Sequence, residues 1–139
     1  MVIADTGFWL ALANRSDRHH AAAKAALAAL REPLITTWPV MTETCHLLVR
    51  SLGIDSQLRF LRNYAEGSFV VFDLSLAHAA RLQALLKGYA DLPMDLADAS
   101  LVILAEHLGH GRILSTDRRD FRSYRWKNRE PFENWLLTD

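Results

Sequence analysis

Met1 is followed by Val2-Ile3-Ala4-Asp5-Thr6-Gly7, a short apolar run that ends in a carboxylate and a turn. A β-branched run bounded by turn residues predicts a short buried strand. The apolar residues Phe8–Leu12 come next, and they predict a helix directly after the turn. The chain therefore begins with a strand that leads through Asp5 into a helix.

The same alternation of short apolar runs and helical stretches continues along the chain. Strands are predicted at Leu34–Thr37, Phe69–Phe72 and Ile113–Leu114, with an edge strand at Phe132–Leu137. Helices are predicted between these strands, at His20–Leu30, Pro39–Gly53, Ile54–Tyr64, Leu76–Leu86 and Asp95–His107, and a short turn or helix at Asp117–Phe121. Leu58 and Leu61 are expected on the inward face of the helix at Ile54–Tyr64. This alternation is typical of an α/β fold with a mainly parallel sheet. No repeat or linker interrupts it, so residues 1–139 are predicted to form a single domain.

Composition narrows the class of protein. Hydrophobic residues make up 50% of the chain and charged residues 23%, which is typical of a globular domain and excludes a disordered one. The formal net charge is zero, so binding to a nucleic acid must depend on local patches of charge. The single cysteine, Cys45, cannot form an internal disulfide, which fits a protein of the reducing cytoplasm. We find no signal peptide and no apolar stretch of the roughly 20 residues that a membrane span needs.

Four acids stand beside apolar segments, namely Asp5, Glu43, Asp98 and Asp117. Asp5 and Asp117 each follow a predicted strand, and ligands of parallel sheets bind beyond the carboxyl ends of the strands. Carboxylates beside buried segments are costly unless a cation pairs with them, and oxygen ligands suit Mg²⁺ or Mn²⁺. The acids therefore favour metal-dependent phosphate chemistry. Taken singly, Asp5 or Asp117 is explained equally well as a helix N-cap, and Glu43 as a solvated side chain.

Each acid lies in a short motif, and the four motifs follow one another at Ile3-Ala4-Asp5-Thr6-Gly7, Thr42-Glu43, Leu96-Ala97-Asp98-Ala99-Ser100 and Ile113–Phe121. In this order they resemble the motifs of PIN-domain ribonucleases, in particular VapC-type toxins of toxin–antitoxin pairs. The resemblance spans nearly the whole chain. It implies a three-layer α/β/α domain with a mainly parallel sheet of about five strands.

The same resemblance implies a role for each acid. Asp5 and Asp98 would be the most direct ligands of Mg²⁺ or Mn²⁺. Glu43 and Asp117 would complete the coordination or hold the attacking water. The implied reaction is endonucleolytic cleavage of structured RNA by a metal-activated water, which leaves a 3′-hydroxyl and a 5′-phosphate.

Other residues are candidates for the same pocket. By the resemblance, Thr6 and Thr116 would hydrogen-bond the carboxylates or the waters around the ion. Asp95 lies three residues before Asp98, so it is either a fifth member of the pocket or, in the interpretation we prefer, the N-cap of its helix. Asp120 is expected to pair with the arginines around it.

Cations crowd into the last part of the chain, at Arg112, Arg118, Arg119, Arg122, Arg125, Lys127 and Arg129. Arginine binds phosphates bidentately, and the aromatic residues between these cations can stack on unpaired bases. We expect Arg118 and Arg119 to contact RNA, because they follow Asp117 directly. A salt-bridged surface, or contact with an acidic segment of an antitoxin, would explain the other arginines.

Two other functions are alternatives to a toxin ribonuclease. A catalytically silent PIN domain used for binding is not favoured, because all four acids are present. A receiver domain needs paired acids early in the chain, and only Asp73 imitates its phosphoacceptor. A VapC-type toxin implies an antitoxin partner and a homodimer, and the helices that begin near Asp17 and Ile54 are candidates for that interface.

Overall fold

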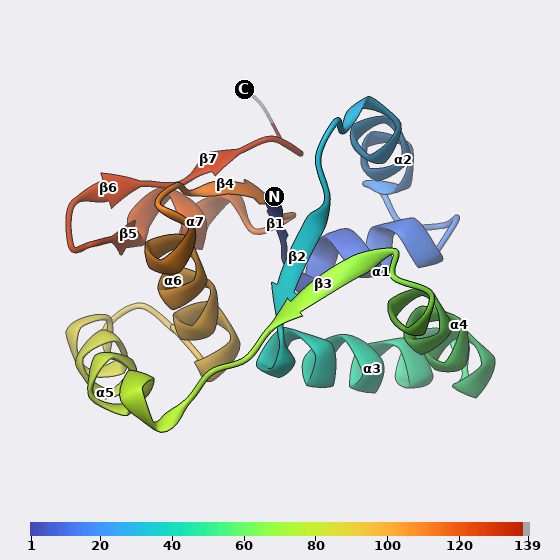
Figure 1. Cartoon of the computed structure of the whole chain (residues 1–139). Helices are drawn as coiled ribbons and strands as arrows, with labels where there is room; N and C mark the ends of the chain where they lie inside the picture. The colour runs from blue at the N-terminus through green and yellow to red at the C-terminus, as the bar shows by residue number, and fades with distance from the viewer. Residues whose placement is uncertain (138–139) are drawn as a thin grey trace.

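The computed structural model describes residues 1–137 of the chain. Its main sheet has five strands in the order β3-β2-β1-β4-β7, each parallel to its neighbours (Figure 1). The strands are β1 (Val2–Ala4), β2 (Leu34–Thr37), β3 (Phe69–Phe72), β4 (Arg112–Leu114) and β7 (Glu133–Asn134). β1 is central, with Ile3 opposite Ile35 of β2 on one side and Ile113 of β4 on the other. The predicted parallel sheet is confirmed.

Helices cover both faces of this sheet. They are α1 (Thr6–Ala13), α2 (His20–Ala29), α3 (Trp38–Leu52), α4 (Ile54–Ala65), α5 (Ala79–Gly88), α6 (Leu96–Leu108) and α7 (Arg118–Ser123), with a short 3₁₀ turn, η1 (Leu76–His78), before α5. Figure 1 shows α5 and α6 on one side of the sheet and α1 to α4 on the other. The expected three-layer α/β/α arrangement is confirmed.

The core is built around β1 and α6. All three residues of β1 are fully buried. In α6 every residue from Ala99 to Ala105 is buried, because this helix is apolar on nearly all sides. Asp98 is the only charged residue between Leu96 and Ala105. A carboxylate at the start of so apolar a helix requires a specific explanation.

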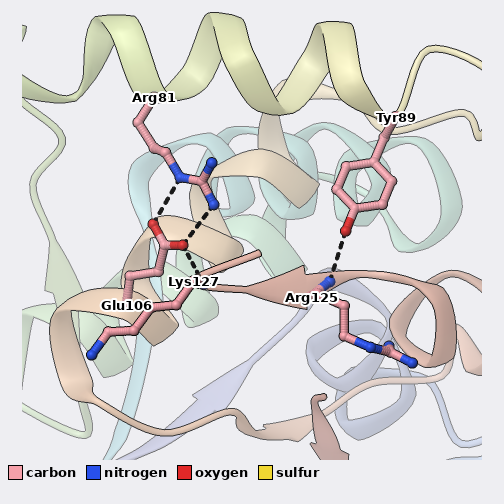
Figure 2. Close-up of polar contacts among 5 residues, drawn as sticks. All are labelled: Arg81, Tyr89, Glu106, Arg125 and Lys127. Carbon is pink, nitrogen blue, oxygen red and sulfur yellow. Dashed lines mark hydrogen bonds and ion pairs between the residues drawn. The ribbon is translucent and has the colours of Figure 1, made fainter. Parts of the chain in front are cut away.

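A two-stranded hairpin, which the sequence pattern does not predict, joins α7 to β7. Its strands are β5 (Arg125–Trp126) and β6 (Glu130–Pro131). Glu106 of α6 holds the hairpin by accepting a hydrogen bond from the backbone N–H of Lys127 (2.6 Å) and pairing with Arg81 of α5 (2.7 Å) (Figure 2). The Tyr89 hydroxyl accepts from the backbone N–H of Arg125 (2.9 Å). The segment Arg125–Lys127, which belongs to the C-terminal group of cations, is thus attached to α5 and α6 through its backbone.

Two details differ from the sequence-based expectations. The helical pattern predicts Leu58 and Leu61 on the inward face of α4, but Leu58 is 50% exposed and Phe60 is buried in its place. Leu58 and Phe60 are two residues apart and therefore point in different directions. The predicted edge strand at Phe132–Leu137 forms, but it is limited to Glu133–Asn134.

Within residues 1–137, no helix is long and apolar enough to cross a membrane.

Candidate active site

Asp5 lies at the carboxyl end of the central strand and begins α1. Its Oδ1 atom accepts a hydrogen bond from the backbone N–H of Thr6 (2.7 Å), so it caps the helix as the N-cap interpretation expects. Its Oδ2 atom accepts from the Ser115 hydroxyl (2.9 Å), which comes from the loop after β4. Only 8% of Asp5 is exposed. The residue is therefore both a helix cap and a buried carboxylate at the edge of the sheet.

Asp117 lies beside Asp5 because β4 pairs with β1. Its backbone N–H donates to the Ser115 hydroxyl (3.0 Å), so one serine side chain links both acids. The Asp117 carboxylate caps α7 by accepting from the backbone N–H of Asp120 (3.1 Å). The predicted meeting of the acids that follow β1 and β4 is thus observed.

Asp98 enters the same region from the first turn of α6. It forms a capping box with Asp95, which accepts from the Asp98 backbone N–H (2.8 Å) and donates its own N–H to Asp98 Oδ2 (3.3 Å). The Tyr124 hydroxyl donates to the same Oδ2 atom (3.2 Å). The preferred interpretation of Asp95 as an N-cap is confirmed, although its carboxylate still acts on Asp98 through its charge.

Glu43 reaches the site from α3, which begins immediately after β2. The helix starts there because Pro39 suits its first turn and Thr37, in extended conformation, leads into it. The α6 helix is tied to the end of β2 by a hydrogen bond between Thr37 and Ser100 hydroxyls (2.6 Å). Glu43 is half-buried, and its negative charge acts on Asp5. Asp5 therefore interacts electrostatically with each of the other three predicted acids at the carboxyl edge of β1, β2 and β4.

Burial and mutual repulsion shift the pKa values of Asp5, Asp98 and Asp117 above the value of a solvated aspartate. Burial, followed by the charges of Glu43 and Asp117, raises the pKa of Asp5 to about 6 despite hydrogen bonds that act in the opposite direction. Burial, then the charges of Asp95 and Asp5, raises the pKa of Asp98 to about 8. Burial also raises the pKa of Asp117. Such carboxylates repel one another, and a divalent cation would relieve both the repulsion and the cost of burial.

The threonines and oxygen donors suit a hard cation chemically. Thr6 Oγ1 is buried and has no hydrogen-bond partner among residues 1–137, which leaves a polar group available for a ligand or its water. Thr116 packs against Gly7, where an added Cβ would lie 1.8 Å from Thr116 Oγ1. In the described residues, however, no three acidic, histidine or cysteine groups lie close enough together to hold an ion.

The basic residues next to Asp117 lie on α7. Arg118 and Arg119 are exposed at its start, and the Arg119 Nε atom lies 3.5 Å from Asp120 Oδ1. The expected pairing of Asp120 with an arginine is thus confirmed. Asp73, the residue that imitates a phosphoacceptor, follows the edge strand β3, away from the acids that follow β1 and β4.

Comparison with known proteins shows the family. The profile of the PIN domain matches residues 2–127 of the sequence. The chain belongs to the PIN domain family.

Relatives of this PIN domain are VapC-type proteins. Ribonuclease VapC26 of Mycobacterium tuberculosis is 28% identical over 124 residues, which cover 89% of this chain and 92% of that protein. The crystal structure of Mycobacterium tuberculosis VapC20, a toxin that cleaves the sarcin–ricin loop, matches with a TM-score of 0.79 at 21% identity, over 86% of this chain and 92% of that one. The resemblance to VapC-type PIN-domain ribonucleases is thereby confirmed.

The PIN-domain site also contains residues that the motifs did not single out. Ser115 bridges Asp5 and Asp117, and it lies within the Ile113–Phe121 motif, in which Thr116 and Asp117 were the candidates for the pocket. Asn134 of β7 fixes the Ser115 backbone by donating to its carbonyl oxygen (2.9 Å) and accepting from its N–H (3.3 Å). Tyr124 is one of the aromatic residues between the C-terminal cations that were expected to stack on unpaired bases, but it is fully buried beside Asp98, so that expectation is wrong for this ring. Alternating hydrophobicity could not identify Tyr124 or Asn134, because both reach the site through tertiary contacts.

Proposed function

We propose that this PIN domain is a divalent-metal-dependent endoribonuclease and the toxin of a VapC-type toxin–antitoxin pair, acting in the cytoplasm on structured RNA. The observation that carries the proposal is the pair of converging carboxylates Asp5 and Asp98. Both have raised pKa values, and the charge of Asp5 contributes to the shift at Asp98. Carboxylates that are buried and repel one another suit a bound Mg²⁺ or Mn²⁺ ion, and the family resemblance implies that the substrate is RNA.

The chain's own residues would share the work as follows. Asp5 and Asp98 would hold the ion, and Glu43 and Asp117 would complete its ligands or orient the water that attacks phosphorus. The ion, when bound, supplies a lowered pKa for that water and neutralises charge on the phosphate. Ser115 keeps one oxygen of Asp5 in place through its hydrogen bond (2.9 Å). Attack by water leaves a 3′-hydroxyl and a 5′-phosphate.

Cleavage of RNA by the purified protein tests this proposal. We expect Mg²⁺ or Mn²⁺ to support cleavage, EDTA to abolish it, and Asp5→Asn to reduce it by at least roughly a hundredfold, because one direct ligand loses its charge. Folding of the variant is checked by circular dichroism. Cleavage that survives both EDTA and Asp5→Asn would contradict a metal–carboxylate mechanism.

An antitoxin would bind in the groove between α1, α2 and α4. This groove encloses about 570 Å³ and includes apolar residues of the core together with three cations, Arg15, Lys24 and Arg59. Trp9 Nε1 and Ser56 Oγ also line it, and they are buried without a hydrogen-bond partner among residues 1–137. Such a surface suits a partner segment that is both apolar and acidic. It involves the two helices that sequence reasoning singled out for the interface, α2 and α4.

We further propose that the toxin is a homodimer, as the resemblance implies. Analytical ultracentrifugation of the protein alone and with its antitoxin measures this directly. A monomer at all micromolar concentrations would contradict it.

A further inference from the structure

An open groove lies beside the acids, between the first turns of α3 and α6. It encloses about 610 Å³ and is lined by Trp38, Pro39, Glu43 and His46 from α3 and by Asp95 and Leu96 at the start of α6. Its size is within the range of small-ligand sites. Glu43 belongs both to this groove and to the acidic site. A molecule in the groove would therefore be adjacent to the reacting phosphate.

The apolar part of the groove is unusually exposed. Trp38 is 43% exposed and Leu96 49% exposed, although both lie at the start of helices that are anchored in the core. Trp38 makes an edge contact with the Tyr64 ring (centroids 5.6 Å apart). Its carbonyl oxygen accepts a hydrogen bond from the Thr42 hydroxyl (3.1 Å). The Tyr64 ring supports one edge of the exposed indole, whose remaining surface can stack on another ring.

The charges of the groove decide what it can bind. Glu43 and Asp95 carry carboxylates, and the groove's lining, as far as the structure describes it, contains no lysine or arginine. A phosphate group would be repelled there. An uncharged aromatic ring would stack on Trp38, while His46 and Thr42 offer hydrogen-bonding groups for its edge.

The topology separates this groove from the arginines. In the sheet order β2-β1-β4, α3 follows β2 and α7 follows β4, so Trp38 and Arg118 lie on opposite sides of Asp5. An RNA strand could place its backbone against α7, its scissile phosphate over the acids, and a base in the groove.

We propose that the groove between α3 and α6 is a subsite for one unpaired nucleobase of the RNA substrate, with Trp38 as its stacking platform. This subsite rests on the proposed ribonuclease function and adds to it the requirement for an unstacked base next to the cleaved bond. Direct hydrogen bonds from the groove then contribute to base preference at that position.

Binding measured without cleavage tests the subsite. The probes are a fluorescein-labelled single-stranded RNA nonamer that contains all four bases and the same nonamer with abasic central nucleotides, each titrated in EDTA. We expect Trp38→Ala to weaken binding of the intact nonamer roughly tenfold, and to leave the abasic nonamer unaffected. Trp38→Phe should retain most of the affinity, because it keeps an aromatic ring.

Trp135→Ala provides the matched control, since Trp135 is 36% exposed and does not line this groove. Indole fluorescence of the unaltered protein gives a second measurement: the nonamer should quench it, and Trp38→Phe should remove that quenching. An equal loss of affinity for both nonamers, or no loss, would overturn the subsite. So would a loss of antitoxin binding alone, which would make the groove a protein-docking surface.

Failure of the subsite and failure of the proposed function give different results. Base-dependent binding through Trp38 together with cleavage that survives EDTA and Asp5→Asn would contradict the metal mechanism and support the subsite. Metal-dependent cleavage with unchanged binding by Trp38→Ala would overturn the subsite and support the enzyme.

Discussion

Individual carboxylates in this site are stabilised by short local hydrogen bonds. Asp5, Asp95 and Asp117 each accept a bond from a backbone N–H at the start of a helix, with lengths of 2.7, 2.8 and 3.1 Å. Such bonds lower the pKa, yet burial outweighs them at Asp5 and Asp117. A capping role and a role in catalysis therefore do not exclude each other at the same residue.

The raised pKa of Asp98 predicts how stability depends on pH. In the folded protein Asp98 keeps its proton up to a pKa of about 8, whereas in the unfolded chain it releases the proton near its ordinary pKa of 3.8. The free energy of unfolding contributed by this group is therefore highest at acidic pH and falls as the pH rises from about 4 to about 8. We expect metal-free protein to lose thermal stability across this window.

Asp98→Asn isolates that contribution, because it removes the titrating group. Its melting temperature should fall less between pH 5 and pH 8 than that of the unaltered chain. Mg²⁺ should stabilise the unaltered chain more at pH 8 than at pH 5, since a cation binds the ionised carboxylates. Identical pH slopes for the two proteins, measured by differential scanning calorimetry, would contradict this account.

Tyr124 is a positioning residue for Asp98. Its hydroxyl donates to the carboxylate (3.2 Å) and so lowers the Asp98 pKa. In Tyr124→Phe we expect the acidic limb of the pH–rate profile to move to higher pH and Mg²⁺ affinity to fall roughly tenfold, because one hydrogen bond to a charged group is lost. Tyr89→Phe is the control, since the Tyr89 hydroxyl bonds the Arg125 backbone instead. Equal profiles for the two variants would show that Tyr124 is merely structural.

At the scale of elements, the site depends on how closely α1 approaches the loop after β4. Gly7 lies in the first turn of α1, directly against Thr116. This approach allows Ser115 to bond Asp5 and Asp117 together. The glycine in the first motif is therefore a packing requirement of the site.

Gly7→Ala tests this close approach. Its Cβ would lie 1.8 Å from Thr116 Oγ1 and 3.0 Å from Thr116 Cβ, so the Thr116 side chain or the loop that carries it must shift, and we expect a loss of about 1–3 kcal/mol in the free energy of unfolding. Gly88→Ala on α5 is the matched control, because its Cβ would meet nothing within 4 Å. That change should be neutral or stabilising by up to about 1 kcal/mol. Urea unfolding distinguishes the two, and equal stabilities would contradict the argument.

At the scale of the whole molecule, the net charge is zero, but acidic and basic side chains are concentrated on different surfaces. The acids converge on one edge of the sheet, α7 carries exposed arginines next to them, and the groove between α1, α2 and α4 carries its own cations. Binding of RNA and of an antitoxin would each depend on local charge, and each should weaken as salt increases.

Arg59→Glu tests the antitoxin groove without touching the acids. We expect it to weaken antitoxin binding roughly tenfold, because it places a negative charge against an acidic segment, while RNA cleavage stays unchanged. Calorimetric titration with the proposed antitoxin measures the affinity. Arg129→Glu, on an exposed side chain of the hairpin segment, is the control. If both variants bind the antitoxin like the unaltered chain, the partner lies elsewhere.

The sequence by itself determined the order of the helices and of the main-sheet strands along the chain, though not the β5–β6 hairpin, and it placed Asp5 and Asp117 together. These features follow from local periodicity and from the rule that parallel strands present their carboxyl ends at one edge. The family motifs added Glu43 and Asp98. Both lie on helices, so the rule about the carboxyl ends of strands could not place them at the site.

Only the tertiary structure decided which other residues complete the site. Tyr124 meets Asp98 from 26 residues away, Asn134 fixes Ser115 from 19 residues away, and Trp38 shares a groove with Leu96. Such contacts arise from the packing of α6 on the sheet and from the pairing of β7 with β4, and hydrophobic periodicity carries no information about them. Hydrophobic periodicity likewise predicted Leu58 on the inward face of α4, whereas Leu58 is exposed and Phe60 is the buried residue at that turn.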